Sequence, residues 1–421
     1  MTIGTGKLRI NYSSRECTAN AQEDSKPERY FPRIWPLYRK RFLLMASIVL
    51  DVTTAEDPRD VVHRAVQALV EGRLVVFPTE TVYVVAASAF YERAVERLSQ
   101  ICREPGSGPL TLAVKSTDEA FDYVPRIPRV GLRLARRCWP GPVTLQLDDA
   151  QNDSLIQRLP TRVKEAVAPA GVIRLRVPAH QLIASALRLL AGPLVIAGAH
   201  RPGEPDSVTA QEAMQRIGKE VDVVIDAGRC KLAQPSTIAY VDHQGFELPR
   251  IGAISETNLK RLASWIAVVV CTGNTCRSPM AEALLRKRIS AKVGCTLDEL
   301  EERGIMVMSA GVAATPGVRP SPEAVAAMKQ RGLDLSMHES QPLTDRLVRF
   351  ADIILTMTHG HRDAIVASFP DAAARTHIIS KNRGDVSDPI GGPPDLYHRC
   401  ADQIDGYLDA WMDDLGFEDE K

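Results

Sequence analysis

The sequence lacks three features that would point to particular partners or compartments. Lysine plus arginine and aspartate plus glutamate both number 52, so the net charge supports neither nucleic acid nor an anionic membrane as a partner. The eight cysteines form no C-x-x-C pair and no Cys/His spacing of a zinc site. This argues against a metal or a disulfide framework and indicates a reducing, cytoplasmic location. No apolar run approaches the roughly 18 residues of a membrane span.

Residues 1–44 are polar and poor in aliphatic side chains, so we predict a disordered leader. Three basic residues, 39–41, precede the apolar stretch 42–50, an arrangement that resembles a signal sequence. The stretch lies far from the start and runs into Asp51 without a cleavage site, so we interpret it as a first β-strand. Met45 is an alternative initiator, in which case the leader would not be translated.

Strand and helix patterns alternate between residues 45 and 255, and they predict one mixed α/β domain. In residues 57–71 the apolar side chains recur on one helical face, and Gly72 follows directly, as is common after a helix. Residues 74–77 (LVVF) follow as a short buried strand. Further apolar runs typical of strands occur at residues 110–114, 143–147, 172–177, 194–196 and 223–225.

Residues 256–265 form a short polar connector that we expect to be helical, and a second α/β domain occupies residues 266–415, before a tail at 416–421. Its first apolar strand, 266–270, leads through a loop to a helix that starts near Ser278. Strand and helix patterns then alternate through residues 306–309, 322–330 and 353–357. This order predicts a parallel sheet covered by helices on both faces.

The most informative segment is the loop at residues 271–278, between that first strand and the helix. Unpaired backbone N–H groups and the helix dipole enable such a loop to hold a tetrahedral anion. Cys271 ends the strand, where the same field favours the nucleophilic thiolate. Arg277 offers a planar fork for two phosphate oxygens, and the Ser278 hydroxyl can hydrogen-bond the thiolate. We expect the phosphate to be bound by Thr272, Gly273, Asn274, Thr275, Cys276 and Ser278.

The sequence C-x5-R-S followed by P-M-A-E resembles the signature of the low-molecular-weight protein tyrosine phosphatases, and Asp388-Pro389 continues the resemblance. The resemblance implies a phosphorylated protein as the substrate and a phosphocysteine intermediate formed without a metal or other cofactor. It also implies that Asp388 protonates the leaving atom and then activates water. The expected catalytic residues are Cys271, Arg277 and Asp388.

Two positions bear on the substrate. Thr275 resembles the protein-arginine phosphatase branch of the family, and Ile390 stands where tyrosine-selective members carry aromatic side chains that stack on the phenol ring. Both favour phosphoarginine, with phosphotyrosine as the alternative. Cys276 is either a small packed residue or the partner of Cys271 in a reversible disulfide.

The first domain resembles the threonylcarbamoyl-AMP synthase (YrdC-like) family at residues 78–83 (PTETVY), 139–144 (WPGPVT), 236–238 (STI) and 250–254 (RIGAI). The resemblance implies chemistry on ATP, threonine and bicarbonate in a tRNA modification. Two motifs depart from the family: K-x-R-P reads Cys102-Arg103-Glu104-Pro105, and S-A-N reads Gly198-Ala199-His200.

These departures predict a domain that folds like the synthase and has lost its activity. A nucleotide or an amino acid is a candidate ligand of this domain, and presenting substrates to the phosphatase is the alternative role. The predicted function of the whole chain is thus a cysteine-dependent protein phosphatase fused to a YrdC-like domain. The alternative is a bifunctional enzyme with an active synthase. A tRNA or double-stranded RNA partner is not supported by the net charge.

Overall fold

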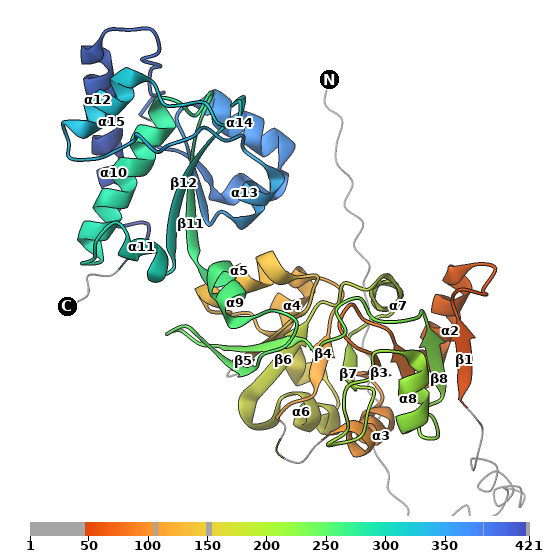
Figure 1. The fold of residues 1–421 in the computed structure, drawn as a ribbon. Coiled ribbons are helices and arrows are strands. Elements are labelled where there is room, and N and C mark those ends of the chain that lie inside the picture. Colours follow the sequence, from red (N-terminus) through yellow and green to blue (C-terminus); the bar gives the residue numbers. More distant parts are fainter. Residues whose placement is uncertain (1–46, 104–105, 107, 149–153, 382, 418–421) are drawn as a thin grey trace, which may run out of the picture. The chain divides into compact units, whose positions relative to one another are not determined.

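The computed structural model describes residues 47–103, 106, 108–148, 154–381 and 383–417 (Figure 1). The described residues all belong to one compact unit, which spans Ala46–Lys421. The predicted leader, the alternative start at Met45 and the altered motif residue Glu104 lie outside the described residues.

The first part of the described chain builds a ten-stranded mixed sheet in the order β1-β8-β2-β3-β7-β4-β6-β5-β9-β10. This confirms the predicted mixed α/β class. The strands are β1 Ile48–Asp51, β2 Val75–Phe77, β3 Val84–Ser88, β4 Thr111–Ala113, β5 Val143–Asp148, β6 Val172–Arg176, β7 Leu194–Gly198, β8 Val223–Asp226, β9 Thr237–Val241 and β10 Phe246–Arg250. The helices are α2 Pro58–Val70, α3 Glu92–Cys102, α4 Thr117–Tyr123, α5 Arg129–Cys138, η1 Leu155–Arg158, α6 Thr161–Val167, η2 Pro169–Gly171, α7 Gln181–Leu189 and α8 Ala210–Ile217.

Helix α2 illustrates how local sequence fixes these elements. The Asp57 side chain accepts a hydrogen bond from the backbone N–H of Arg59, and Pro58 fills the first turn, where no N–H donor is required. The apolar face then buries Val62 and Leu69 in a cluster that also contains side chains of strands β2 and β8. The helix forms where the apolar periodicity predicts it, because the N-cap residue and the apolar face both indicate a helix in this segment.

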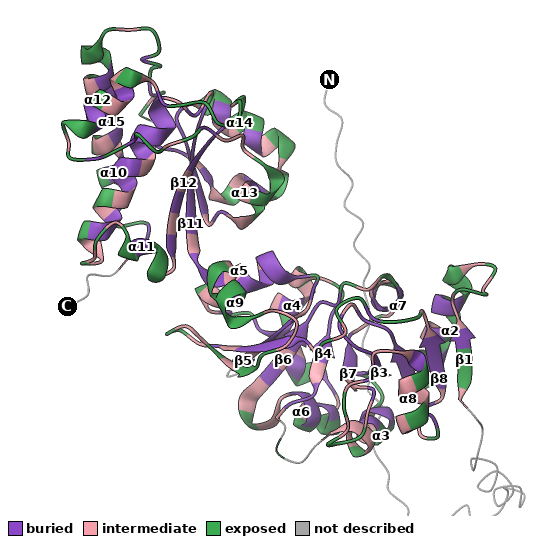
Figure 2. Cartoon of the chain, viewed as in Figure 1, coloured by how far each residue is buried: buried purple, intermediate pink, exposed green. Residues whose placement is uncertain are grey.

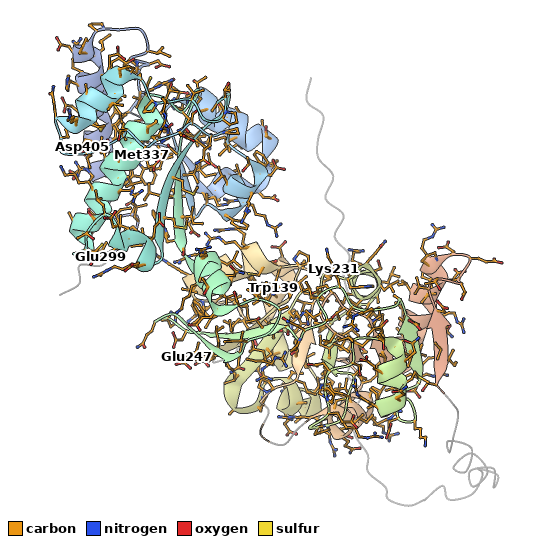
Figure 3. The ribbon with its side chains drawn as sticks, in the orientation of Figure 1. Trp139, Lys231, Glu247, Glu299, Met337 and Asp405 are labelled. Atoms are coloured by element: carbon orange, nitrogen blue, oxygen red, sulfur yellow. The ribbon has the colours of Figure 1, made fainter. Side chains whose placement is uncertain are left out.

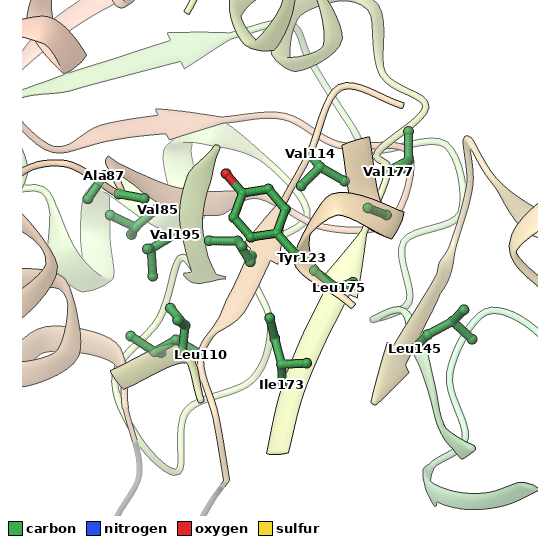
Figure 4. Packing of buried hydrophobic residues seen from close by; sticks show 14 of the residues in the cluster. Val85, Ala87, Leu110, Val114, Tyr123, Leu145, Ile173, Leu175, Val177 and Val195 are labelled. Atoms are coloured by element: carbon green, nitrogen blue, oxygen red, sulfur yellow. The ribbon is translucent and has the colours of Figure 1, made fainter. Parts of the chain in front are cut away.

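Apolar clusters cover both faces of the ten-stranded sheet, as the buried strands in Figure 2 show. Figure 4 shows the larger cluster, in which Tyr123 of helix α4 lies among aliphatic side chains such as Val114, Leu175 and Val195. Trp139, labelled in Figure 3, is also buried there, and its indole N–H donates to the Val143 carbonyl at 2.7 Å. The sheet is therefore the centre of a two-sided core.

The second part of the chain builds a four-stranded, all-parallel sheet in the order β12-β11-β13-β14, which confirms the predicted parallel sheet. Its strands are β11 Trp265–Cys271, β12 Ile305–Gly311, β13 Ile353–Thr356 and β14 Thr376–Ile378. The helices from the connector onward are α9 Glu256–Ala263, α10 Arg277–Lys292, α11 Glu299–Glu302, α12 Pro322–Lys329, α13 Asp345–Phe350, α14 His359–Ser368, η3 Pro370–Arg375 and α15 Pro394–Asp409.

Strand β11 occupies the position that matters most for the site. From β11 the chain passes first to β12 on one side and later to β13 on the other. Such a reversal leaves a crevice beyond the carboxyl ends of the strands, where ligands of open α/β sheets bind. Helices α10, α12 and α15 pack on one face of the sheet, while α13 and α14 pack on the other (Figure 1).

A buried arginine on helix α5 contacts the amino ends of strands β11 and β13. The Arg137 side chain is fully buried and pairs with Asp352 at 2.8 Å, and it donates to the carbonyls of Leu262 and Ser264. Asp352 also pairs with Arg136 at 2.7 Å and accepts the backbone N–H of Ile266 at 2.8 Å. One carboxylate thus joins helix α5 to the start of β11.

Replacing Arg137 by alanine leaves Asp352 buried without its innermost partner. Removal of one member of a buried ion pair typically costs about 3–5 kcal/mol. We expect Arg137→Ala to lower the free energy of unfolding by an amount of that order, measured by urea denaturation. Arg59→Ala, at a pair whose arginine side chain is 84% exposed, is the matched control and should change stability by less than about 0.5 kcal/mol. Equal effects of the two substitutions would contradict the role given to Arg137.

Candidate active site

Cys271 ends strand β11, and its sulfur lies inside the loop that follows. The backbone N–H of Asn274 donates to the sulfur at 3.2 Å, and the Ser278 hydroxyl lies 3.0 Å away. The thiol is 3% exposed. Donors at these distances suit a negatively charged sulfur, since hydrogen bonds to ionised groups are stronger than those to neutral ones. The structure therefore brings Cys271 and Ser278 together, as the loop sequence predicts.

The Asn274 side chain shapes the loop from inside. The residue is fully buried and has a φ of 58°, in the left-handed region that asparagine tolerates better than most residues. Its Nδ2 donates to the hydroxyls of Ser278 at 2.9 Å and Ser309 at 2.8 Å, and its Oδ1 accepts the Gln341 N–H at 2.8 Å. These bonds hold the turn that directs the Asn274 backbone N–H at the sulfur.

The end of strand β12 supports the same loop. A side chain at Gly311 would place its Cβ 2.4 Å from the Thr272 carbonyl oxygen and 3.1 Å from the Asn274 nitrogen. Only glycine fits such a close approach of two backbones. The next two residues, Val312 and Ala313, donate their N–H groups to the carbonyls of Cys271 and Thr272, both at 3.0 Å.

Arg277 and Asp388 lie side by side although 111 residues separate them. Arg277 Nη2 lies 2.5 Å from Asp388 Oδ2, and its Nη1 donates to the Val386 carbonyl at 3.0 Å. Its Nε is buried and has no partner among the described residues. A buried N–H without a partner is unfavourable, so this atom favours entry of an oxyanion. The predicted site residues Cys271, Arg277 and Asp388 thus gather around one loop.

Exposed aliphatic side chains lie at the rim of the loop. Ile390 is 66% exposed, and its N–H donates to Asp388 Oδ1 at 3.2 Å. Met337, labelled in Figure 3, is 83% exposed and precedes His338, whose Nε2 lies 3.0 Å from the Asn274 carbonyl. Thr275 is partly exposed on the loop itself. No aromatic side chain stands at the Ile390 position.

Cys276 is buried behind the loop, with its sulfur 3.4 Å from the Ser321 hydroxyl and 4.0 Å from the Tyr397 hydroxyl. Both Cys271 and Cys276 are free thiols. This burial agrees with the interpretation of Cys276 as a small packed residue. A reversible disulfide between Cys276 and Cys271 stays a prediction.

Three residues that support the loop were not identified from the sequence: His338, Gln341 and His361. They reach the loop through hydrogen bonds from distant parts of the chain. None of the three stands in a motif whose spacing points at the loop, so only the assembled sheet reveals them. Glu282, the last residue of the P-M-A-E motif, lies next to this network: burial raises its pKa, and a hydrogen bond from Ser309 opposes that shift.

Comparison with known proteins agrees with this geometry. Residues 266–421 match the family model described as low molecular weight phosphotyrosine protein phosphatase. This region is 38% identical over 145 residues to a protein-arginine-phosphatase of Bacillus subtilis, and the alignment covers 34% of this chain and 90% of the relative. The region belongs to this phosphatase family. A solved low molecular weight protein tyrosine phosphatase from T. tengcongensis is 34% identical. Its alignment covers 36% of this chain and 100% of the solved chain, with a TM-score of 0.33.

Residues 67–252 of the chain match the Sua5/YciO/YrdC family, whose model is described as telomere recombination. A threonylcarbamoyl-AMP synthase of Pyrococcus abyssi is 31% identical over 168 residues, which cover 40% of this chain and 47% of that relative. The chain therefore carries a YrdC domain followed by a phosphatase domain.

The YrdC domain contains a cavity of about 340 Å³ lined by four arginines. Arg176 is paired with Glu80, and the other three come from distant segments: Arg103, Arg174 and Arg250. The guanidinium groups donate to the carbonyls of Gly108, Pro109 and Ser236, respectively. None of the three forms an ion pair with a carboxylate that the structure describes. Burial, followed by repulsion from Arg250 and Arg103, lowers the pKa of Arg174 to about 10. This crowding of positive charge favours an anionic ligand.

The altered motifs line the same cavity. His200 Nε2 lies 3.3 Å from Asp206 Oδ1, and the hydrogen bond between them raises the pKa of His200. Burial raises the pKa of the Cys102 thiol to about 12. Arg174 of strand β6 also lines this cavity, so a guanidinium outside the K-x-R-P motif enters it.

Neither a metal cluster nor a membrane span occurs in the part of the chain that the structure describes. No three or more His, Cys, Asp or Glu side chains there are grouped so that they could hold a metal ion. The helices in the same residues are all too short or too polar to cross a bilayer.

Asn274→Ala tests the internal hydrogen-bond network of the loop. The substitution removes the bonds to the Ser278 and Ser309 hydroxyls and leaves the Gln341 N–H without its partner, at about 1–3 kcal/mol for a buried unsatisfied group. We expect kcat/KM for p-nitrophenyl phosphate to fall by roughly 30-fold or more. Asn258→Ala, on the exposed surface of helix α9, should leave kcat/KM unchanged. A loop variant with full activity would show that Asn274 does not shape the site.

Proposed function

We propose that the phosphatase domain hydrolyses phosphoarginine in proteins through a phosphocysteine intermediate. The Cys271 thiolate attacks phosphorus, the P–N bond breaks, and Asp388 in its protonated form gives its proton to the leaving guanidine nitrogen. Asp388 then takes a proton from the water that attacks phosphocysteine, which releases inorganic phosphate and restores the thiolate. The observation that carries the proposal is the buried, unpartnered Nε of Arg277 beside a loop whose Asn274 N–H donates to the Cys271 sulfur.

In this mechanism the positive field comes from the chain itself. Arg277 and the loop N–H groups hold the three oxygens of the transferring phosphoryl group, on which negative charge develops. Ser278 donates to the sulfur when it becomes the leaving group of the second step, 3.0 Å away in the free protein. Asp388 is 40% exposed and lies at the mouth of the loop, where a leaving group and a water can reach it.

The choice of phosphoarginine rests on the rim. An aliphatic Ile390, 66% exposed, gives no aromatic face on which a phenol ring could stack, an interaction worth about 1 kcal/mol. Thr275 adds a hydroxyl near the leaving nitrogen, which can accept a hydrogen bond from a guanidine N–H. The relatives include both arginine and tyrosine phosphatases, so phosphotyrosine is the alternative substrate.

We expect kcat/KM for a phosphoarginine protein to exceed that for a phosphotyrosine protein by roughly tenfold or more, which corresponds to about 1.4 kcal/mol. Release of inorganic phosphate from both substrates, measured on one preparation, provides the comparison. Cys271→Ser should abolish turnover of both while still binding them. A phosphotyrosine kcat/KM equal to or above the phosphoarginine value would reverse the assignment.

For the YrdC domain we propose that synthase activity is lost while an anionic ligand, a nucleotide or an acidic group of an amino acid, still binds. The replacement of K-x-R-P and S-A-N motif residues supports the loss. The cavity lined by Arg103, Arg174 and Arg250 supports retained binding. An active synthase acting towards tRNA modification is the alternative, and the cytoplasmic location predicted from cysteine usage suits either role.

Incubation with ATP, threonine and bicarbonate separates these possibilities. We expect no pyrophosphate release above a protein-free background, while ATP or AMP raises the midpoint of thermal unfolding because it binds the folded cavity. Arg174→Ala should remove that thermal shift without changing phosphatase activity. Steady pyrophosphate release that depends on threonine would establish the bifunctional enzyme.

A further inference from the structure

The first turn of helix α14 lies beside the phosphate loop. Strand β13 pairs with β11 up to Thr356 opposite Val270, and the Met357 N–H donates to the Val270 carbonyl at 3.0 Å. Thr358 then caps the helix by accepting the His361 N–H at 3.2 Å. This pairing fixes the start of α14 at the carboxyl edge of the sheet, next to the residue that precedes Cys271.

His361 on this turn contacts the loop directly. Its Nε2 lies 2.9 Å from the Thr272 hydroxyl, and the residue is only 8% exposed. The other ring nitrogen, Nδ1, is buried and has no partner among the described residues. The bond to Thr272 is therefore the one side-chain hydrogen bond that the described structure gives this ring.

Burial and the charge of Arg277 favour the neutral form of His361, and the carboxylates of Asp385 and Asp388 oppose that shift. The charged groups that face it are Arg277, Asp385 and Asp388, and burial followed by the repulsion of Arg277 lowers the pKa of His361. His359, on the same turn, contacts Asp385 with both its backbone N–H and its Nδ1, at 2.9 and 2.7 Å. The turn thus touches the phosphate loop through His361 and the segment before Asp388 through His359.

We propose that His361 is a positioning residue of the phosphatase, whose imidazole fixes the Thr272 side chain and with it the first peptide of the phosphate loop. Thr272 is exposed, so without this bond its side chain would be free to rotate, and its peptides would be held only through the bonds from Val312 and Ala313. Loop N–H groups stabilise a transition state only when they are held in place before the reaction. His361 acts through Thr272 and does not touch the substrate. The inference rests on the proposed phosphatase activity.

A double-mutant cycle tests this role. We expect His361→Ala and Thr272→Val each to lower kcat/KM roughly tenfold, and the double variant to lose no more than either single variant, because all three lack the same bond. His361→Gln, whose amide can still bond the Thr272 hydroxyl, should recover activity to within about threefold. Asp363→Ala, at an exposed carboxylate of the same helix, is the matched control and should retain full activity.

The outcomes separate this inference from the proposed function. A wild-type protein that hydrolyses no phosphorylated substrate overturns the proposed function. An active wild type overturns the positioning role if losses of the single variants multiply in the double variant, or if His361→Gln is as impaired as His361→Ala. Should His361→Ala fail to fold, Thr272→Val remains decisive, because its position is exposed: unchanged kcat/KM in this variant also overturns the role.

Discussion

The site depends on the hydrogen bonds of the Asn274 side-chain amide. A loop that presents its N–H groups to an anion must turn its carbonyls away, and this requires a backbone conformation that few side chains accept. Here one buried amide holds that conformation by bonding to the helix that follows the loop, to the neighbouring strand and to the Gln341 backbone. The alignment of Cys271, Ser278 and Arg277 follows from the turn that this network fixes.

The sequence predicts the parts of the site that are local. An apolar strand, Cys271, a short loop and Arg277 are contiguous, so strand-to-helix geometry alone places them around one anion. Asp388 came from family resemblance, because an isolated Asp-Pro is also a common turn. Gln341 and His361 could not be predicted, since their contacts depend on the order of strands in the sheet. Strand β3 was missed for a different reason: its alanines and serine have weak β-propensity, and pairing on both sides compensates.

The two domains use positive charge in opposite ways. In the phosphatase domain a single guanidinium is already paired with Asp388, and its buried Nε has no partner among the described residues. In the YrdC domain four guanidinium groups line one cavity, and the described hydrogen bonds of three of them go to neutral oxygens and hydroxyls. The K-x-R-P and S-A-N positions alone do not reveal the positive charge of this cavity, because Arg174 enters it from a strand on which alternate side chains face the core.

Strand β11 links two features that lie at its opposite ends. Asp352 holds its first residues against helix α5, and the loop holds Cys271 at its last. Seven residues of strand span about 20 Å. Because successive side chains alternate between faces, a slip of one residue would turn the sulfur towards the opposite helical layer. The strand therefore keeps a fixed distance between Asp352 and Cys271. The position of the nucleophile depends partly on the ion pair of Asp352 with Arg137 at the opposite end of the strand.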